Sequence, residues 1–365
     1  INATSGLVTG VAPGTATMTY TVVGTGGCAN VTATRTVTVT AAPVAGTLSG
    51  NQNICVGLTS TFSSTAVGGT WSSSDTTIAT INTTSGLVTG VAAGTSIISY
   101  RLSTGCFTIA VTTVHPLPGA ITGPSAVCVN STITLFDSTL GGTWSSTTPG
   151  VATVGLSSGV VTGMSAGTTT ISYSLGSGCG VATTVLVNPL PSAITGSASG
   201  CVGYTISLTD ATPGGLWSSG DTAVAIIGIG SGVVTGVTTG LSVITYTLPT
   251  GCTMTAVLTV KPLPLLYTVT GGGSFCTGGT GVHVLLSGST TGVSYQLYNG
   301  TTPEGFAVAG TGSGIDFGLI TPAGIYTVMA TDAITSCSST MVSSATITAL
   351  PLPVAHTVTG GGSYC

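Results

Sequence analysis

The sequence predicts an all-β chain built as tandem two-sheet sandwiches, and its composition, its internal period and its strand patterning each support this fold class. Of the 365 residues, 57 are Gly and 42% are hydrophobic. β-Branched Thr and Val are abundant, whereas the helix-favouring residues Glu, Lys and Arg are nearly absent. We therefore expect short strands that are joined by glycine-rich turns.

The internal period is 73 residues, because five independent markers recur at that step. Three residues or motifs of each kind follow one another at this spacing: Trp71, Trp144, Trp217; Tyr100, Tyr173, Tyr246; Cys55, Cys128, Cys201; Cys106, Cys179, Cys252; and the Pro-Leu-Pro segments that begin at Pro116, Pro189 and Pro262. A repeat of this length and regularity is the signature of a tandem array.

The Pro-Leu-Pro segments set the expected domain boundaries. Three full copies occupy residues 44–117, 118–190 and 191–263, and residues 1–43 match the C-terminal half of a copy. Residues 264–353 form a longer domain of a second type, and residues 354–365 repeat its beginning. We therefore expect the sequence to start and stop inside a domain. Because proline fixes φ and removes a donor, the joints should be short and stiff, and the array should be an elongated rod.

Period-two alternation within each copy supports the sandwich. In one strand of each copy an Ile, a Tyr and a Leu share a face, as in Ile98, Tyr100 and Leu102. About seven short strands in 73 residues fit a two-sheet sandwich. In the longer domain, Asn299-Gly300 predicts a hairpin with a type I′ turn.

The cysteine spacing predicts one disulfide inside each domain. The expected pairs are Cys55–Cys106, Cys128–Cys179, Cys201–Cys252 and Cys276–Cys337, with Cys28 and Cys365 left as halves of incomplete domains. Closing such a loop should stabilise a small sandwich by about 4 kcal/mol in the chain-entropy model. Disulfides of this kind indicate an oxidising compartment. CxxC pairs and His-rich spacing are absent, so we expect no metal and no cofactor.

Charge excludes several classes of partner. Charged residues form 3% of the chain, against about 25% in ordinary soluble domains, and the cations are Arg35, Arg101 and Lys261. Without a basic patch, nucleic acid and anionic membranes are poor partners. No apolar run reaches the roughly 18 residues that a membrane helix needs, so we expect no membrane insertion.

A family resemblance rests on a run of motifs in the first full copy. Gly68-Gly69-Thr70-Trp71 with Ser72-Ser73-Ser74-Asp75, followed by Gly86-Leu87-Val88-Thr89-Gly90-Val91 and Ala93-Gly94-Thr95, resembles the group 2 bacterial immunoglobulin-like (Ig-like) domains. The resemblance covers residues 1–263, and with its paired cysteines and proline joints the chain looks like the giant tandem-repeat surface proteins of Bacteroidota. Tyr295-Gln296-Leu297-Tyr298-Asn299-Gly300-Thr301 resembles another module of those proteins. The resemblance implies Ig-like sandwiches, export by the type IX pathway, and an extracellular adhesin, surface filament or stalk.

The remaining candidate site residues have structural and functional interpretations. The three Trp residues are either sugar-stacking platforms or, as their fixed position favours, core residues of a central strand. The seven acidic residues are scattered, so no pair of carboxylates is expected to form a hydrolase site and the chain is expected not to be an enzyme. Asp75 and Asp221 lie in Ser-rich turns, where Asp caps its own backbone. His115, His283 and His356 are interpreted as surface or strand-end residues.

Three short motifs resemble the Bacteroidota O-glycosylation pattern of Asp, then Ser or Thr, then a small apolar residue. They are Asp75-Thr76-Thr77, Asp137-Ser138-Thr139 and Asp221-Thr222-Ala223. The candidate modified residues are Thr76, Ser138 and Thr222, and glycans are the expected modification.

The sequence therefore predicts a non-catalytic structural segment of an extracellular filament or adhesin stalk. With so little charge to keep chains apart, a homo-polymer formed through lateral or end-to-end contacts is the expected partner. A carbohydrate-binding adhesive module and a spacer region of a secreted multidomain enzyme are alternative interpretations. Ice binding, suggested by Thr-Val-Thr alternation, is a weaker one, because those Thr residues recur in different strands.

Overall fold

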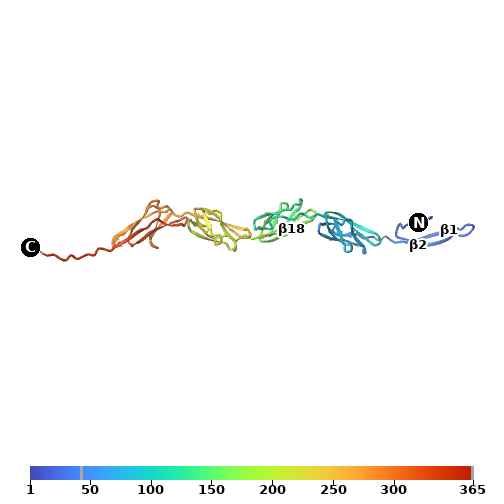
Figure 1. Cartoon of the computed structure of the whole chain (residues 1–365), viewed down its shortest axis with the longest axis horizontal. Coiled ribbons are helices and arrows are strands. Elements are labelled where there is room, and N and C mark those ends of the chain that lie inside the picture. The colour runs from blue at the N-terminus through green and yellow to red at the C-terminus, as the bar shows by residue number, and fades with distance from the viewer. Residues whose placement is uncertain (42–43, 363–365) are drawn as a thin grey trace. The chain divides into compact units, whose positions relative to one another are not determined.

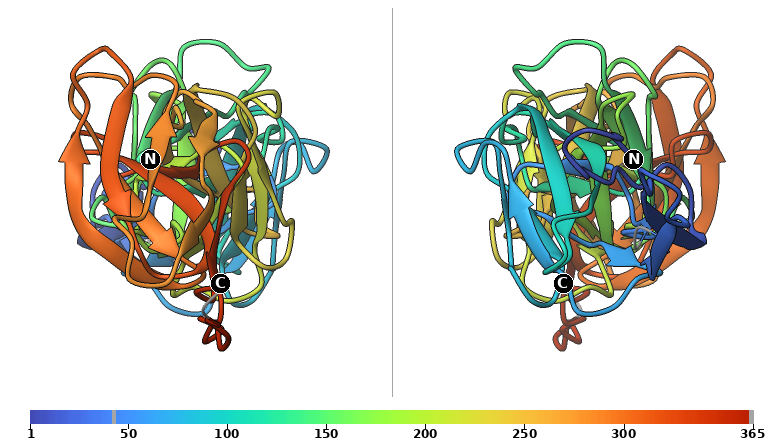
Figure 2. Two further views of the ribbon diagram at one scale, coloured as in Figure 1. Left: turned by 90° about the vertical axis from the view of Figure 1, so that its left-hand side faces the viewer. Right: turned by 90° about the vertical axis from the view of Figure 1, so that its right-hand side faces the viewer.

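The computed structural model describes residues 1–41 and 44–362, and within them the chain consists of strands and connecting loops (Figures 1 and 2). Nowhere in these two ranges does a helix occur that is long and apolar enough to cross a membrane. Cys365, which the sequence assigns to a further domain, lies outside the described residues. The chain divides into two compact units, Ile1–Val187 and Asn188–Cys365, and each is described by itself.

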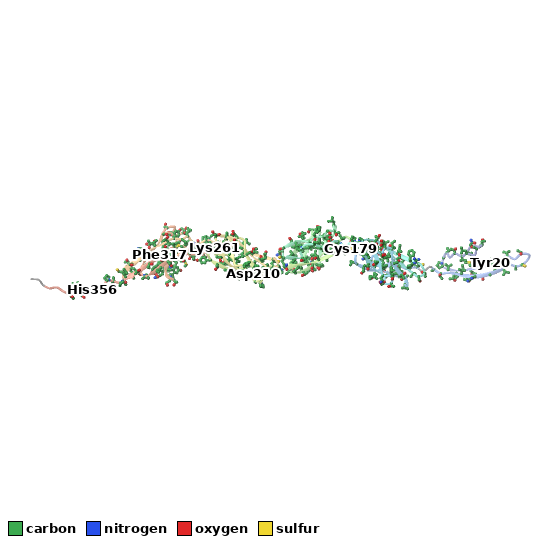
Figure 3. The ribbon with its side chains drawn as sticks, viewed as in Figure 1. Tyr20, Cys179, Asp210, Lys261, Phe317 and His356 are labelled. Atoms are coloured by element: carbon green, nitrogen blue, oxygen red, sulfur yellow. A yellow bond between two sulfur atoms is a disulfide. The ribbon has the colours of Figure 1, made fainter. Side chains whose placement is uncertain are left out.

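Residues 1–41 contain one long hairpin. Strand β1 (Gly14–Val22) pairs antiparallel with β2 (Val31–Val39), from Gly14 opposite Val39 to Val22 opposite Val31. Most of its side chains are exposed, and Tyr20, which is labelled in Figure 3, is 73% exposed. This segment therefore has the strands of a half sandwich without a buried core.

The repeat at 44–117 is a sandwich whose strands form three sheets. Its first sheet has the order β4-β11-β10-β7, in which β4 runs parallel to the last strand β11 and the other pairs are antiparallel. A three-stranded sheet with the order β5-β9-β8 and a two-stranded sheet of β3 and β6 complete the repeat. The strands are β3 (Leu48–Ser49), β4 (Asn53–Cys55), β5 (Thr59–Thr61), β6 (Ser63–Ser64), β7 (Thr70–Ser73), β8 (Ala79–Ile81), β9 (Leu87–Gly90), β10 (Gly94–Arg101) and β11 (Phe107–His115).

The next two repeats share the strand order of the first sheet and differ in the second sheet. In 118–190 the sheets have the orders β12-β18-β17-β14 and β13-β16-β15, and in 191–263 the orders are β20-β26-β25-β22 and β19-β21-β24-β23. The strands of the first are β12 (Ala126–Cys128), β13 (Thr132–Thr134), β14 (Thr143–Ser146), β15 (Ala152–Val154), β16 (Val160–Gly163), β17 (Gly167–Ser174) and β18 (Gly180–Asn188). Those of the second are β19 (Thr195–Gly196), β20 (Ser199–Cys201), β21 (Thr205–Thr209), β22 (Leu216–Ser219), β23 (Ala225–Ile227), β24 (Val233–Gly236), β25 (Gly240–Thr247) and β26 (Thr253–Lys261).

The 264–353 segment is a sandwich with longer strands. One sheet has the order β27-β29-β32, and the other has the order β28-β35-β33-β30-β31, with β34 paired to β33. The strands are β27 (Val269–Gly271), β28 (Gly273–Cys276), β29 (Val282–Leu286), β30 (Val293–Asn299), β31 (Thr302–Ala309), β32 (Ile315–Ile320), β33 (Gly324–Asp332), β34 (Ser338–Thr340) and β35 (Ala345–Leu350). From residue 44 to 353 the chain is therefore all-β, built as tandem β-sandwiches.

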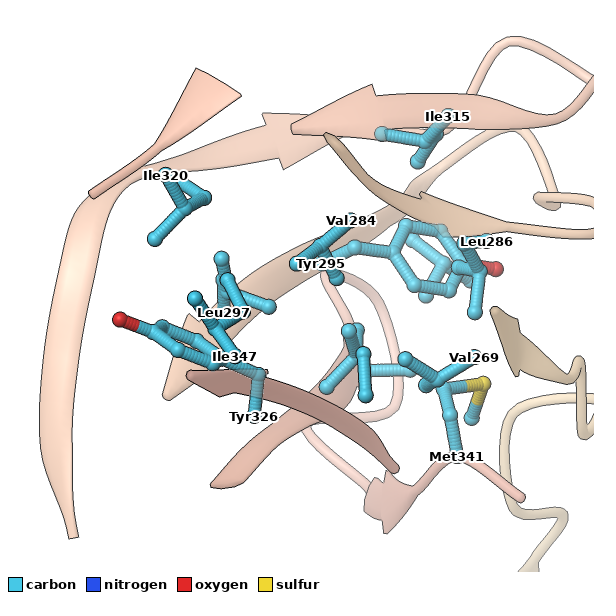
Figure 4. Close-up of a cluster of buried hydrophobic side chains, with 14 residues drawn as sticks. Val269, Val284, Leu286, Tyr295, Leu297, Ile315, Ile320, Tyr326, Met341 and Ile347 are labelled. Carbon is cyan, nitrogen blue, oxygen red and sulfur yellow. The ribbon is translucent and has the colours of Figure 1, made fainter. Parts of the chain in front are cut away.

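Each sandwich has its own core. Four separate clusters of buried side chains lie in the four segments from residue 44 to 353, and Figure 4 shows the one built around Tyr295 and Tyr326. Alternation along the strands produces these cores, as in β10, where Ser96, Ile98 and Tyr100 are buried and their neighbours are not.

The repeated Trp packs on the repeated Tyr in each core. Trp144 is 5% exposed, and its ring centroid lies 4.8 Å from that of Tyr173, its cross-strand partner. This confirms the core interpretation of the Trp residues. The expectation of a central strand is wrong, because β7, β14 and β22 each lie at the end of their sheet.

The predicted hairpin at Asn299 is confirmed, but its turn differs from the prediction. Asn299 pairs with Thr302, so the two loop residues are Gly300 and Thr301, one position later than expected. Gly300 has φ 61° and Thr301 has no positive φ, whereas a type I′ turn requires positive φ at both central residues.

Candidate functional site

The functional feature that the structure adds is a set of disulfides that join neighbouring sandwiches. Cys55 of the 44–117 repeat bonds to Cys179 of the 118–190 repeat, with Cα atoms 5.7 Å apart. Cys201 of the 191–263 repeat bonds to Cys337 of the 264–353 segment, with Cα atoms 5.8 Å apart. Cys179 is labelled in Figure 3.

These two bonds overturn all four predicted pairs. Cys55–Cys106 and Cys128–Cys179 are wrong because Cys55 and Cys179 bond to each other. Cys201–Cys252 and Cys276–Cys337 are wrong because Cys201 and Cys337 bond to each other. Cys128 and Cys252 are disulfide-bonded as well, and Cys28, Cys106 and Cys276 carry free thiols.

Strand direction explains why a bond inside one sandwich is impossible. Cys55 lies opposite His115, the last residue of β11, whereas Cys106 directly precedes Phe107, the first residue of that strand. Nine residues of strand span about 30 Å, and disulfides need Cα atoms within about 7 Å of each other. The two cysteines of a repeat therefore lie at opposite ends of the same sandwich.

The second cysteine lies at the end of the sandwich where the chain arrives from its predecessor. In the 118–190 repeat, Cys179 lies in the β17–β18 hairpin, close to Tyr173. The Tyr173 hydroxyl donates to the carbonyl oxygen of Thr139 at 2.6 Å, and the Thr139 hydroxyl accepts from the amide of Gly119 at 2.9 Å. The hairpin and the start of the repeat thus share one end, within reach of the preceding Cys55.

Polar contacts accompany the second disulfide. The Tyr204 hydroxyl, three residues after Cys201, donates to the carbonyl oxygen of Ser338 at 3.2 Å. The Lys261 ammonium donates to the carbonyl oxygen of Thr335 at 3.4 Å. The backbone amide of Thr335 is the main cause that lowers the pKa of Asp332, and Lys261 contributes to the same shift. One of the three cations of the chain therefore lies at this joint.

The Trp residues offer little surface to a sugar. A shallow cavity of about 350 Å³ in the 118–190 repeat is lined in part by Trp144, Tyr173 and Asp137. Trp144 is only 5% exposed and Tyr173 6%. Sugar-binding aromatic platforms need an exposed ring face, so these rings act in the core.

The candidate glycosylation residues are exposed. Thr76, Ser138 and Thr222 lie at the surface in turns. In all three turns the preceding Asp caps its own backbone. As expected, Asp75 accepts from the amide of Thr77 at 2.9 Å and Asp221 from the amide of Ala223 at 2.9 Å, and Asp137 accepts from the amide of Thr139 at 2.8 Å. The side-chain and backbone hydrogen bonds from Thr77 lower the pKa of Asp75.

The titratable residues form no larger constellation. Within residues 1–41 and 44–362, no group of three or more His, Cys, Asp or Glu side chains is arranged to hold a metal ion. One exposed pair escaped the sequence analysis: His283 Nδ1 lies 2.9 Å from a carboxylate oxygen of Asp316, and this hydrogen bond lowers the Asp316 pKa. The two residues are 33 positions apart, on β29 and β32, so only the strand pairing brings them together.

No known protein family profile matches the chain. It is 30% identical over 285 residues to Ice-binding protein 1 of Shewanella frigidimarina (strain NCIMB 400), an alignment that covers 67% of this chain. The chain spans 31% of the length of that relative.

Several solved structures resemble the fold at low similarity. They include a C-terminal 282-residue fragment of intimin, solved with an intimin-binding domain (TM-score 0.27, 21% identity, 40% of this chain and 65% of that chain), and the N-terminal eight Ig domains of Down Syndrome Cell Adhesion Molecule (TM-score 0.27, 11% identity, 92% and 51%). Domains 1–6 of the surface layer protein SbsC have a TM-score of 0.20 at 15% identity, covering 87% and 55%.

Proposed function

We propose that this chain is a non-catalytic structural segment of an extracellular filament or adhesin stalk that lies beyond the cell envelope. The observation that carries the proposal is the covalent linkage of successive sandwiches by disulfides. Such bonds persist in oxidising compartments and are rare in the cytosol. A stalk must keep its domains connected to one another, and disulfides between domains provide such a connection.

We also propose that the chain associates with itself through the solvent-exposed face of the sheet that contains β10 and β11, and through the matching face of other repeats. On β10 and β11, Ile97 faces Val111, and Ile109 and Phe107 continue this row with exposed fractions from 40% to 62%. The 191–263 repeat has the same exposed row in Leu241, Val243 and Val257. Exposed apolar rows on a chain with 3% charged residues favour association with a second copy, since little charge keeps the faces apart.

Sedimentation and electron microscopy of the purified chain test this proposal. We expect assemblies whose fraction rises with concentration, and dispersal when Val243→Lys and Val257→Lys place two cations on one outer face. Leu140→Lys, at a residue 89% exposed in a loop of another repeat, is the matched control and should leave assembly unchanged. A chain that stays monomeric at every concentration, or a control as disruptive as the double variant, would contradict self-association.

Ice binding is a second candidate function, because the relative is named an ice-binding protein. In β26 (Thr253–Lys261), exposed Thr253 and Thr255 alternate with half-buried Met254 and Ala256. An ice-recrystallisation assay with the full chain tests this function. It is supported if the chain inhibits recrystallisation and if Thr→Lys substitutions on one outer face abolish that inhibition. Unaltered ice growth would exclude it for this segment.

A further inference from the structure

We propose that the two disulfides confine tension to a short path of strands and keep most of each sandwich outside it. This inference rests on the proposed stalk function and specifies how the stalk would bear force. The load path consists of residues 44–55, 179–201 and 337–353, joined by the bonds Cys55–Cys179 and Cys201–Cys337. The two intervening loops, residues 56–178 and 202–336, contain nearly all of the Trp and Tyr cores.

The load path crosses the 118–190 repeat along a single strand. Force that arrives through Cys179 passes directly into β18 and leaves it at Asn188. β18 lies inside its sheet, between β12 and β17, and pairs with β17 from Gly180 opposite Ser174 to Val187 opposite Gly167. A strand already spans about 3.3 Å per residue, close to the maximum of about 3.6 Å. Tension along β18 therefore produces almost no extension.

The other parts of the load path are extended in the same way. Residues 44–55 include β3 and β4, and β4 pairs with β11. After β18 the path runs through Pro189-Leu190-Pro191, whose prolines hold an extended backbone, into β19 and β20. Beyond Cys337 it follows β34 and β35, and β35 pairs with both β28 and β33. The load path thus runs mainly through strands and proline joints, which short turns connect.

The number of residues in each disulfide-closed loop sets how much contour length the bond excludes from the stretched chain. The bonded cysteines are 124 residues apart in the first loop and 136 in the second. At about 3.5 Å per residue, these loops hold about 430 Å and about 480 Å of contour length. In a chain without any disulfide, tension would pass through every strand of the cores, and unfolding would release this length.

Single-molecule force extension of the full chain, held through tags at its two ends, tests the inference. The contour length of a fully stretched chain depends only on its covalent connections, so each increment reports directly which cysteines are bonded. In a background with Cys128→Ser and Cys252→Ser, which removes the other bonded cysteines, we expect the Cys55→Ser/Cys179→Ser pair to add about 430 Å and the Cys201→Ser/Cys337→Ser pair about 480 Å. Cys28→Ser with Cys106→Ser is the control and should add nothing.

The outcomes separate this inference from the proposed function. Equal contour lengths before and after reduction would overturn it, as would increments of about 180 Å, which the 51-residue spacing of Cys55 and Cys106 would give. A short oxidised contour in a chain that never assembles would support the load path and contradict the self-associating filament. Assemblies built from chains with the full contour length would do the reverse.

Discussion

Replacing Tyr173 by Phe should weaken the 118–190 repeat by about 2–3 kcal/mol. The Tyr173 hydroxyl donates to the carbonyl oxygen of Thr139 at 2.6 Å and accepts from the amide of Gly142 at 2.8 Å. Its removal leaves one amide and one carbonyl without a partner, and because both lie in a partly buried place each costs about 1–1.5 kcal/mol, the low end of the range for buried groups. The ring stays against Trp144, so packing is retained and the change isolates the two hydrogen bonds.

Hydrogen exchange followed by mass spectrometry measures this loss where it occurs. Since 1.4 kcal/mol is a factor of ten, the Gly142 amide should exchange about 30- to 150-fold faster in the variant. Amides of the 191–263 repeat serve as the internal reference, and Tyr20→Phe, at a residue 73% exposed, is the matched control. Unchanged protection of Gly142, or an equal change in the control, would refute the role assigned to the hydroxyl.

Three further predictions follow from particular residues. Gly159→Ala should lower the free energy of unfolding in urea by more than about 3 kcal/mol, because φ is +67° and an added Cβ would overlap a backbone carbonyl oxygen. The control Gly141→Ala, at φ +84° in open space, should lower it by about 1–2 kcal/mol, and equal losses would contradict the overlap. The amide of Thr335 lowers the folded-state pKa of Asp332, so the ionised carboxylate stabilises the fold above the unfolded pKa of about 3.9, and this stabilisation is lost as pH falls through the folded pKa. Asp332→Asn should make the free energy of unfolding less dependent on pH in the acid range, and an unchanged pH profile would contradict this. Intact-mass and peptide analysis of native material should find a glycan that Thr222→Ala removes, and an unmodified Thr222 peptide would contradict that site.

Much of the fold could be predicted from the sequence because it depends on local patterns. Alternation alone indicated that Ile98 and Tyr100 share a buried face, and the fixed spacing of Trp71 indicated a core position. The place of that Trp at a sheet edge could not be predicted, since strand order depends on pairing between distant segments. The same limit hid the His283–Asp316 pair.

The disulfides were mispredicted for a reason that the topology makes plain. Equal spacing of Cys55 and Cys106 in each copy fits a bond inside a repeat and a bond to the next repeat equally well, because a 73-residue period preserves both patterns. Only the parallel pairing of β4 with the end of β11 shows that Cys55 lies far from Cys106. The direction of one three-residue strand therefore decides the connectivity.

Peptide mapping of the unreduced native chain by mass spectrometry tests the central claim, that disulfides link neighbouring sandwiches, most directly. We expect one cross-linked peptide pair that contains Cys55 and Cys179 and another that contains Cys201 and Cys337, both of which disappear on reduction. Peptides that join Cys55 to Cys106, or free thiols at Cys179 and Cys337, would contradict the account.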